Sequence, residues 1–249
     1  MMLLCIMRYV VYFDDLTIEK IGSKTEEFSQ PLEVLSLNLS QEAMQRLRNK
    51  RVDAFQLGIL KTTDNDWVKG LLHSSDSSTD RRIKLRLKGD WLDHLEDDKW
   101  SFRIRMRDTD TWRRMREFSL HTPKARAFLM EWVLHEFFKR EDVLTTRYDF
   151  VQLKLNDKNL GVYAAEEHFD KVLLEYNHRR EGPIVKFIED GFWEGAARSM
   201  QQVDVGDHDL NQTGKKMEAA DIRPFKENQL LANPVLAKQF ESAHQLMHQ

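Results

Sequence analysis

Two neighbouring segments in the middle of the chain alternate between apolar and polar, mostly cationic, side chains. They cover residues 82–89 and 99–107 and flank an acidic turn that begins with Gly89 and Asp90. The apolar positions are Ile83, Leu85, Leu87, Trp100, Phe102, Ile104 and Met106, and the cationic ones are Lys84, Arg86, Lys88, Arg103, Arg105 and Arg107. Because successive side chains of a strand point to opposite faces, this pattern predicts two strands, each buried on one face and cationic on the other. The cationic face is either a solvated hairpin surface or a cradle for phosphate.

The remaining patterns predict an α+β fold. Strand periodicity covers residues 33–39, 66–73, 82–89, 99–107, 147–155 and 160–167, with shorter strands at 117–121 and 182–190. Ser40 is the predicted N-cap of a helix that continues to about Leu57, whereas Thr122 and Pro123 begin a helix that continues to about Lys139. We expect an antiparallel sheet with the Pro123 helix packed on it. Further helices are expected at 168–177 and 234–249.

The chain divides into an N-terminal extension at 1–32, a main domain at 33–190, and an irregular connection with the start of a helical lobe at 191–249. The extension begins with MMLLCIMRYVVYF, which is shorter than the roughly 20 apolar residues of a membrane span. It is either a buried strand or the remnant of a signal or anchor segment. We expect contact with a membrane only if it is an anchor remnant.

Charge and cysteine content exclude several kinds of site. The net charge is −3, so the chain has no global basic field of the kind that marks proteins binding nucleic acid. Cys5 is the single cysteine, which rules out an intramolecular disulfide and a thiolate metal cluster. Asp204, Asp207 and Asp209 are closely spaced but lack the pattern of a calcium-binding loop. The sequence predicts no metal site and identifies no catalytic residue.

Four motifs occur in a characteristic order. They are KGDW at 88–91, DKWSF at 98–102, FSLHTPKARAFLMEWVLHEFF at 118–138 and LNDKNLGVYAAEEHFDKVLLE at 155–175. This combination resembles the CotH kinase family, which comprises atypical kinases similar to spore coat protein H, over roughly Ile83 to Asp190. Two positions depart from the family pattern: Lys88 replaces the usual Arg, and Trp100 replaces the second Lys of a Lys-Lys pair.

The resemblance implies a protein-kinase-like N-lobe and, in the complete form, ATP-dependent transfer of phosphate to Ser or Thr of an envelope or coat protein. It implies ATP and Mg²⁺ or Mn²⁺ as cofactors. In such enzymes a Lys held by a Glu contacts the nucleotide phosphates. Lys99 takes that position here and Glu167 is its expected partner, while Lys88 and Arg103 supply further positive potential. The alternative is that these residues belong to solvated strand faces.

The family also has a C-terminal lobe with His-Asn and paired Asp motifs, and nothing after Asp190 resembles them. We therefore expect a chain truncated inside the kinase fold that transfers no phosphate by itself. A non-catalytic structural or interaction protein, similar to a spore coat protein or an envelope assembly factor, is the alternative function. The family favours the cell envelope as its location, and the cytoplasm is the alternative.

Overall fold

The computed structural model describes residues 2–6, 9–13, 31–180, 182–187, 222–224 and 227–247, with side chains described only from residue 31 onward. Contacts divide the chain into two units, Met1–Leu32 and Glu33–Gln249. In the first unit, strands β1 (Met2–Ile6) and β2 (Tyr9–Phe13) pair in antiparallel orientation. The apolar N-terminal segment therefore forms strands, and the burial of its side chains lies outside the described part.

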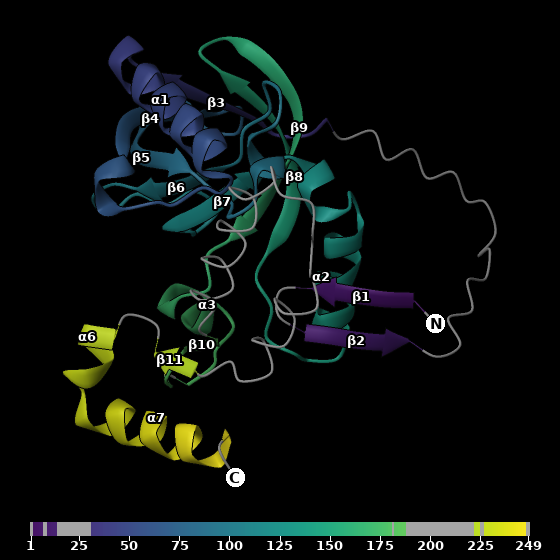
Figure 1. Ribbon diagram of the computed structural model, residues 1–249, viewed down its shortest axis with the longest axis vertical. Coiled ribbons are helices and arrows are strands. Elements are labelled where there is room, and N and C mark those ends of the chain that lie inside the picture. The colour runs from purple at the N-terminus through teal and green to yellow at the C-terminus, as the bar shows by residue number, and fades with distance from the viewer. Residues whose placement is uncertain are drawn as a thin grey trace, which may run out of the picture. The chain divides into compact units, whose positions relative to one another are not determined.

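The second unit is built around a closed barrel of strands in the order β3-β4-β5-β6-β7-β9-β8 (Figure 1). The strands are β3 (Val34–Leu39), β4 (Val68–Ser74), β5 (Arg81–Leu87), β6 (Phe102–Met106), β7 (Glu117–His121), β8 (Tyr148–Leu155) and β9 (Lys158–Glu167). Each lies where the sequence predicts a strand. The α+β class is confirmed in the form of a mixed fold with few helices.

The barrel interior explains the alternation seen in the sequence. Inward positions are fully buried in one apolar core that includes Leu35, Leu37, Ile83, Leu85, Phe102, Ile104, Phe118, Leu120, Leu153 and Tyr163. The intervening residues of β5 and β6 point outward, as their cationic character predicts. Burial of these large apolar side chains is the main stabilising contribution to the barrel.

The expected antiparallel sheet is wrong at one junction, where β3 pairs with β8 in parallel orientation and closes the sheet. The backbone N–H of Gln152 donates to the backbone carbonyl of Glu33, and the backbone N–H of Asn156 donates to that of Leu37. The Asn156 side chain also bonds both backbone groups of Leu39. Closure satisfies backbone groups that an open edge would leave unpaired. The alternation in the sequence is the same for an open and a closed sheet, so it did not predict closure.

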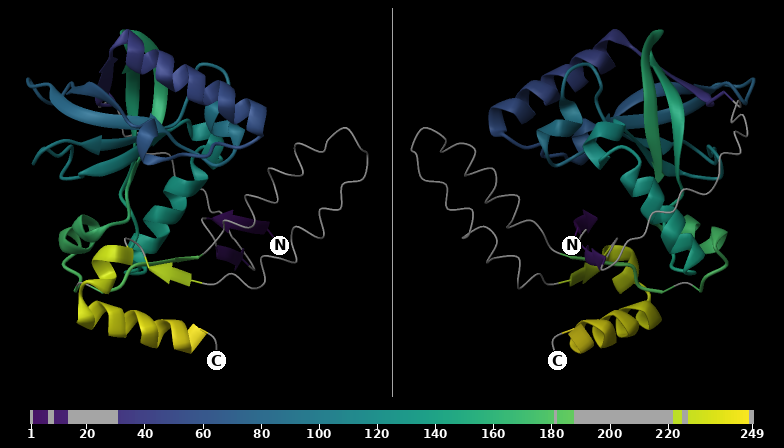
Figure 2. Two further views of the ribbon diagram at one scale, coloured as in Figure 1. Left: turned by 60° about the vertical axis from the view of Figure 1, so that its left-hand side comes forward. Right: turned by 90° about the vertical axis from the view of Figure 1, so that its right-hand side faces the viewer.

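Helix α1 (Gln41–Leu57) begins and ends as its sequence predicts. The Ser40 side chain accepts a hydrogen bond from the Ala43 amide, and Gly58 ends the helix in the left-handed region, at φ 84°. Leu47 and Ala54 of this helix are buried. The helix lies against β4 and β5 of the barrel (Figure 2).

The predicted Pro123 helix is interrupted. A short 3₁₀ helix, η3 (Pro123–Arg126), precedes Ala127 and Phe128, both of which have positive φ angles. Helix α2 (Met130–Arg140) starts only after this break and contacts β8. The break redirects the chain because the Phe128 amide bonds the Pro123 carbonyl. Thr122 makes no side-chain cap, so its predicted capping role is wrong.

Smaller elements follow the barrel. They are η1 (Asp64–Asp66) and η2 (Leu92–Leu95) within it, and after it α3 (Lys171–Tyr176), the antiparallel pair β10 (Val185–Phe187) and β11 (Ile222–Pro224), α6 (Glu227–Leu231) and α7 (Pro234–Met247). The proposed domain boundary at 190 falls among residues outside the described ranges and stays a prediction. No helix in the described ranges is long and apolar enough to cross a membrane.

Candidate functional site

Three polar side chains from different parts of the barrel meet on its outer face. Lys88 Nζ lies 2.9 Å from Glu166 Oε2, and His121 Nε2 lies 2.7 Å from the same oxygen. Lys88 Nζ is also 3.2 Å from His121 Nε2. The three side chains are largely buried, with exposed fractions of 14% for Lys88, 7% for Glu166 and 0% for His121. We call Lys88, His121 and Glu166 the central cluster.

Strand geometry places these side chains on one face. Lys88 follows the inward Leu87 at the end of β5, and its amide bonds the Ser101 carbonyl across to the β6 segment. On β7 and β9, His121 and Glu166 follow the buried, inward-pointing Leu120 and Ala165. Each cluster member is therefore next to an inward residue and points outward.

Burial and mutual charge set the protonation of the cluster. Burial lowers the pKa of Lys88 to about 8, although the Glu166 charge acts in the opposite direction. Burial raises the pKa of Glu166, but the Lys88 charge and the His121 hydrogen bond outweigh it and hold that pKa well below its usual value. Burial, with the Lys88 charge second, holds the pKa of His121 well below its usual value too. At neutral pH the cluster is thus a Lys⁺–Glu⁻ pair beside a neutral imidazole.

A second layer of charge comes from the segment around the α2 break. Arg126 Nε lies 3.5 Å from Glu131 Oε2, and the Glu131 carboxylate is nearly buried, at 6% exposed. Burial raises the pKa of Glu131 to about 7, against the lowering effect of Arg126. Burial and the neighbouring Glu131 charge also raise the pKa of the Tyr148 hydroxyl.

Several buried polar atoms around the cluster have no hydrogen-bond partner in the described part of the chain. They are Arg103 Nε, Arg126 Nε, Glu131 Oε2, His121 Nδ1, Ser119 Oγ and Tyr148 OH. Buried donors without acceptors are costly, and an anionic oxygen ligand satisfies such donors. The cationic donors of Arg103 and Arg126, beside Lys88, fit the phosphate groups of a nucleotide.

The described residues fit a metal ion less well than they fit a phosphate group. Among the described residues, no group of three or more His, Cys, Asp or Glu side chains is arranged to hold one. Asp204, Asp207 and Asp209 lie outside the described residues. The Mg²⁺ that the family implies therefore has no ligand set in the described part of this chain.

The expected pairing of Lys99 with Glu167 is wrong. Glu167 Oε1 is bound by Arg147 Nη2 at 2.6 Å, in a pair that buries the carboxylate. Lys99 Nζ lies 5.9 Å from the centre of the Tyr163 ring and beside Gly161. Gly161 and Glu167 are separated by six positions of β9, or about 20 Å along an extended strand. Lys99 and Glu167 therefore lie at different ends of the barrel wall, and any role of either in binding nucleotide stays a prediction.

The other two expected residues lie at the cluster or beside it. Lys88 is a member of the cluster, with Glu166 rather than Glu167 as its partner. Arg103 Nη1 bonds His168 Nδ1, and the same atom lies 3.8 Å from Glu117 Oε1. The charge of Arg103 interacts with the charges of both Glu166 and Lys88. Arg103 therefore adds positive charge to the site, as its strand position predicts.

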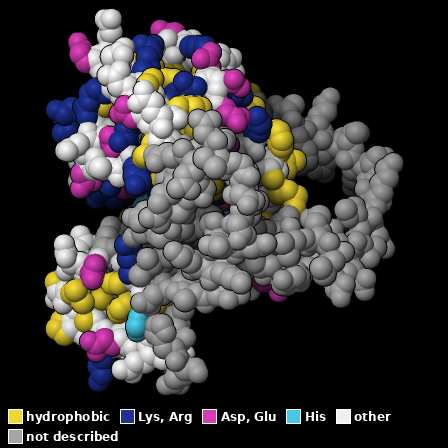
Figure 3. All heavy atoms as spheres, viewed as in Figure 1, with side chains coloured by type: hydrophobic (Ala, Val, Ile, Leu, Met, Phe, Trp, Pro, Cys, Tyr) yellow, Lys and Arg dark blue, Asp and Glu magenta, His cyan; other side chains and the backbone are white. Residues whose placement is uncertain are grey.

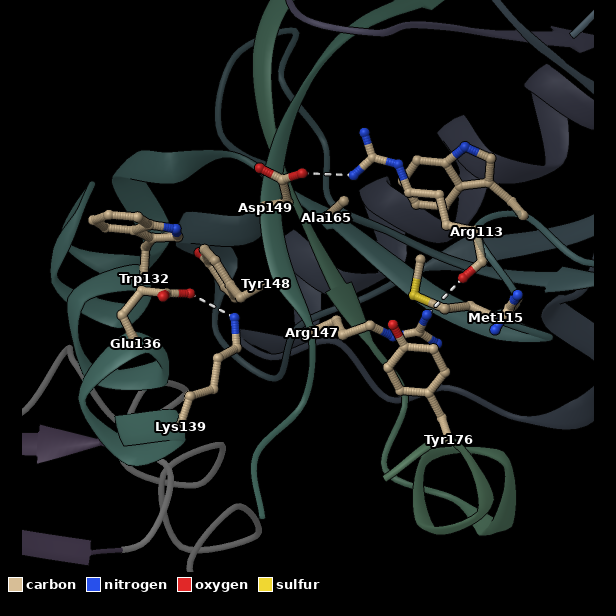
Figure 4. Close-up of a pocket in the computed structure, with 12 residues that line it drawn as sticks. Arg113, Met115, Trp132, Glu136, Lys139, Arg147, Tyr148, Asp149, Ala165 and Tyr176 are labelled. Carbon is tan, nitrogen blue, oxygen red and sulfur yellow. Dashed lines mark hydrogen bonds and ion pairs between the residues drawn. The ribbon is translucent and has the colours of Figure 1, made fainter. Parts of the chain in front are cut away.

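A cavity on the barrel is lined from α2, the start of β8, the 112–115 turn and α3 (Figure 4). Its volume is about 530 Å³, and its aromatic walls are Trp112, Trp132, Tyr148 and Tyr176. Its cations are mostly held by acids of the same region: Arg113 lies 2.7 Å from Glu33 and 2.6 Å from Asp149, and Lys139 lies 2.5 Å from Glu136. Because these charges are neutralised locally, the cavity is a weaker candidate for phosphate than the central cluster.

Sequence reasoning missed Glu166, His121, Arg126, Glu131 and Tyr148. For His121 and Glu166, the alternation of the sequence contained a signal that could have located them. In EFSLH the alternation places His121 opposite the buried Phe118 and Leu120, on the outer face where Lys88 also lies. In β9 the same alternation points Tyr163 inward and Glu166, three positions later, outward. Arg126 and Glu131 carried none, because the break before α2 decides where they point.

One comparison with known proteins identifies a family. The sequence model of the CotH kinase protein matches residues 85–236, which contain all members of the central cluster. A search of the curated proteins finds no relative that matches. The family match extends over more than half of the 249 residues. The chain therefore belongs to the CotH kinase protein family.

Proposed function

We propose that this chain provides the nucleotide-binding part of an ATP-dependent kinase that phosphorylates Ser or Thr of an envelope or coat protein. The observation that carries the proposal is the buried Lys88–Glu166 ion pair, with 2.9 Å between Nζ and Oε2. Protein kinases use a Lys held by a Glu to position the nucleotide phosphates. Family membership supports kinase-like function in general, and the choice of Lys88 as the phosphate-contacting residue rests on the geometry.

The proposed likeness to a kinase N-lobe rests on how three charged side chains are arranged, and it does not rest on the sheet as a whole. A cationic strand end, a carboxylate on another strand and a helix carrying a second carboxylate surround one site, formed by Lys88, Glu166 and Glu131. The closed barrel differs from an open antiparallel sheet. We infer that the barrel serves as the rigid support of the site, since strand positions hold side chains more precisely than loops do.

Each residue has a defined task in this proposal. Glu166 holds the Lys88 ammonium in place, and His121 donates to the same carboxylate from Nε2, which fixes its orientation. With a pKa of about 8, Lys88 is mostly protonated at pH 7 and presents a positive charge to phosphate. Arg126 and Arg103 add positive potential to the cluster. ATP, when bound, supplies the phosphoryl group.

The test is a titration of the 249-residue protein with a fluorescent ATP analogue. Lys88→Met removes the proposed contact, and Lys88→Met/Glu166→Gln removes both charges, so that no unpaired carboxylate stays buried. Lys99→Met is the matched control, since it removes a lysine near the same hairpin that lies outside the cluster. We expect both Lys88 variants to weaken binding at least tenfold and Lys99→Met to change it less than twofold.

Circular dichroism and thermal melting show which variants are folded. Equal loss of binding in Lys99→Met and in the folded double variant contradicts the assignment of Lys88. Absence of ATP binding by the folded wild-type protein contradicts the proposed function and favours a non-catalytic structural or interaction role.

A further inference from the structure

The outer face of β4, β5 and β6 concentrates positive charge in a protein whose net charge is −3. We call this surface the cationic strip, and its members are Lys69, Arg82, Lys84, Arg86, Arg105 and Arg107. Figure 3 shows Lys and Arg side chains gathered on the side of the barrel where Figure 1 places β5 and β6. Lys69, Arg82, Lys84 and Arg105 are exposed, while Arg86 and Arg107 are half-buried.

Strand register brings like charges directly opposite one another. Lys84 pairs with Lys69 on one side and with Arg105 on the other, so three cations form a row across the strands. Arg86 faces Arg103 in the adjacent row. Like charges in direct cross-strand positions destabilise a sheet, typically by a few tenths of a kcal/mol or more per pair. The barrel carries this cost on the face of β5 along which Lys88 also lies.

The acids beside the strip neutralise only part of it. Arg82 lies 2.6 Å from Asp108, and Arg105 lies 2.9 Å from Glu117. Within the described residues, no ion pair is formed by the other strip cations, Lys69, Lys84, Arg86 and Arg107. Arg86 and Arg105 instead stack over Trp67, with guanidinium-to-ring distances of 5.2 Å and 4.5 Å. The strip therefore presents a surplus of oriented positive charge.

The strip continues into the proposed phosphate site. Arg82, Lys84, Arg86 and Lys88 follow one another at every second position of β5 and its extension. The first three face outward along the strip, and Lys88 belongs to the central cluster. Alternate residues of an extended chain are about 6.7 Å apart. An extended segment with acidic side chains at alternate positions matches this spacing.

We propose that the cationic strip is a docking surface for an extended acidic segment of the acceptor protein, which it aligns toward the central cluster. This inference rests on the proposed kinase function for the identity of the partner. Strands β4, β5 and β6 are each paired on both sides, so the segment binds through side chains and does not add a strand. The acceptor class is then a Ser- or Thr-bearing protein with acidic residues near its phosphorylation site.

Size and charge favour a short peptide segment over a membrane or a duplex. From Arg82 to Lys88 the strip extends about 20 Å, the length of about seven extended residues. Electrostatic attraction is screened beyond about 8 Å at physiological salt, so a short acidic segment meets mainly the strip. A large anionic surface also meets the rest of a molecule whose net charge is negative.

The experiment measures binding of a rhodamine-labelled octapeptide of alternating Glu and Ser by fluorescence anisotropy. The peptide control replaces Glu by Gln. Lys69→Gln/Lys84→Gln removes two strip charges, and Lys154→Gln/Lys238→Gln removes two lysines that belong to β8 and α7. Both double variants lower the net charge equally, from −3 to −5. ATP binding is measured on the same samples.

We expect the Glu peptide to bind the wild type, with loss of roughly fivefold in affinity in the strip variant and less than twofold in the control. The Gln peptide should not bind, and ATP binding should persist in both variants. Equal loss in both variants, or absence of Glu-peptide binding, overturns the docking surface. Displacement of the peptide by vesicles of 3:1 phosphatidylcholine and phosphatidylglycerol, or by duplex DNA, at a lower charge concentration overturns the choice of a peptide. Peptide binding without ATP binding contradicts the proposed function and leaves the docking surface standing.

Discussion

Lys88 and Glu166 are 78 residues apart in sequence, and their strands are not neighbours, yet their side chains form a buried ion pair. In the barrel, β6 and β7 lie between β5 and β9. Lys88 Nζ and Glu166 meet across these two strands, and His121 from β7 contacts both of them. The pair thus depends on how the barrel arranges four strands as well as on the two residues.

Removing one partner of this pair should destabilise the fold more than removing both. Lys88→Met or Glu166→Gln alone leaves a buried group without its partner, and we expect each change to lower the free energy of unfolding by about 3 kcal/mol. The double variant should lose clearly less than the sum. Urea denaturation measures all four proteins, and strictly additive losses would show that the pair contributes no coupling.

Glu131 should make the stability depend on pH in a recognisable window. Its pKa is raised on folding from 4.5 to about 7, so between those pH values the folded state binds more protons than the unfolded state. The free energy of unfolding should therefore fall as the pH rises from 4.5 to 7. Glu131→Gln removes this contribution, and its stability relative to the wild type should increase by roughly 2 kcal/mol across the window.

The control for this experiment is Glu136→Gln, a change at a more exposed carboxylate of the same helix, paired to Lys139 at 2.5 Å. Its stability should follow that of the wild type across the same window. If the free energies of unfolding of Glu131→Gln and the wild type changed with pH in parallel, the burial of an ionisable Glu131 would be contradicted. Urea denaturation at half-unit pH intervals makes the comparison.

Gly89→Ala should destabilise the turn that follows Lys88. Gly89 has a φ angle of 117°, and an added Cβ would lie 2.4 Å from the His94 ring. His94 is buried and hydrogen-bonded to Ser101, so it has little room to move. Backbone strain and the clash together should cost roughly 2–4 kcal/mol.

Gly161→Ala serves as the matched control for the same backbone effect. Gly161 also has a positive φ angle, 78°, but a Cβ there would meet only Lys99 Nζ, at 3.4 Å. We expect a loss of about 1 kcal/mol from conformation alone. Thermal and urea unfolding of both variants test the difference, and a Gly89→Ala protein as stable as Gly161→Ala would contradict the packing of His94 under the turn.

Ala127→Gly should be neutral or stabilising, which is unusual for a glycine substitution next to a helix. Ala127 is exposed with φ 50°, a conformation that glycine adopts without the steric cost of a Cβ. We expect a change between zero and about 1 kcal/mol in favour of the folded state. Ala54→Gly in α1, where Ala54 is buried, should instead cost about 1 kcal/mol or more. Equal destabilisation by both would contradict the break before α2.

Local pattern predicted much of this structure because each strand buries one face. The alternation in residues 82–89 and 99–107 located β5 and β6 and turned Lys88 and Arg103 outward. Ser40 predicted the start of α1 because N-capping is a local interaction. Closure through β3 and β8 was not predictable in this way, since it depends on contacts between segments more than 100 residues apart.

The site was harder to predict, because one position along a strand decides the face. Glu166 and Glu167 are adjacent and both buried, but the first meets Lys88 outside the barrel and the second meets Arg147. The family resemblance pointed to Glu167, whereas the alternation from Tyr163 points Glu166 outward. The left-handed conformations of Ala127 and Phe128 have no local signal, because neither residue type favours them.

The most direct test of Lys88 as the phosphate-contacting residue is chemical labelling with an acyl phosphate of ATP. The amine of a lysine beside the bound phosphates attacks the acyl carbon, an amide forms, and ATP leaves with the bonding electron pair. Digestion and mass spectrometry then identify the acylated lysine, with and without excess ATP as competitor. We predict labelling of Lys88 that excess ATP suppresses, and labelling of Lys99 that ATP leaves unchanged. Suppression by ATP at Lys99 and not at Lys88 would contradict this assignment.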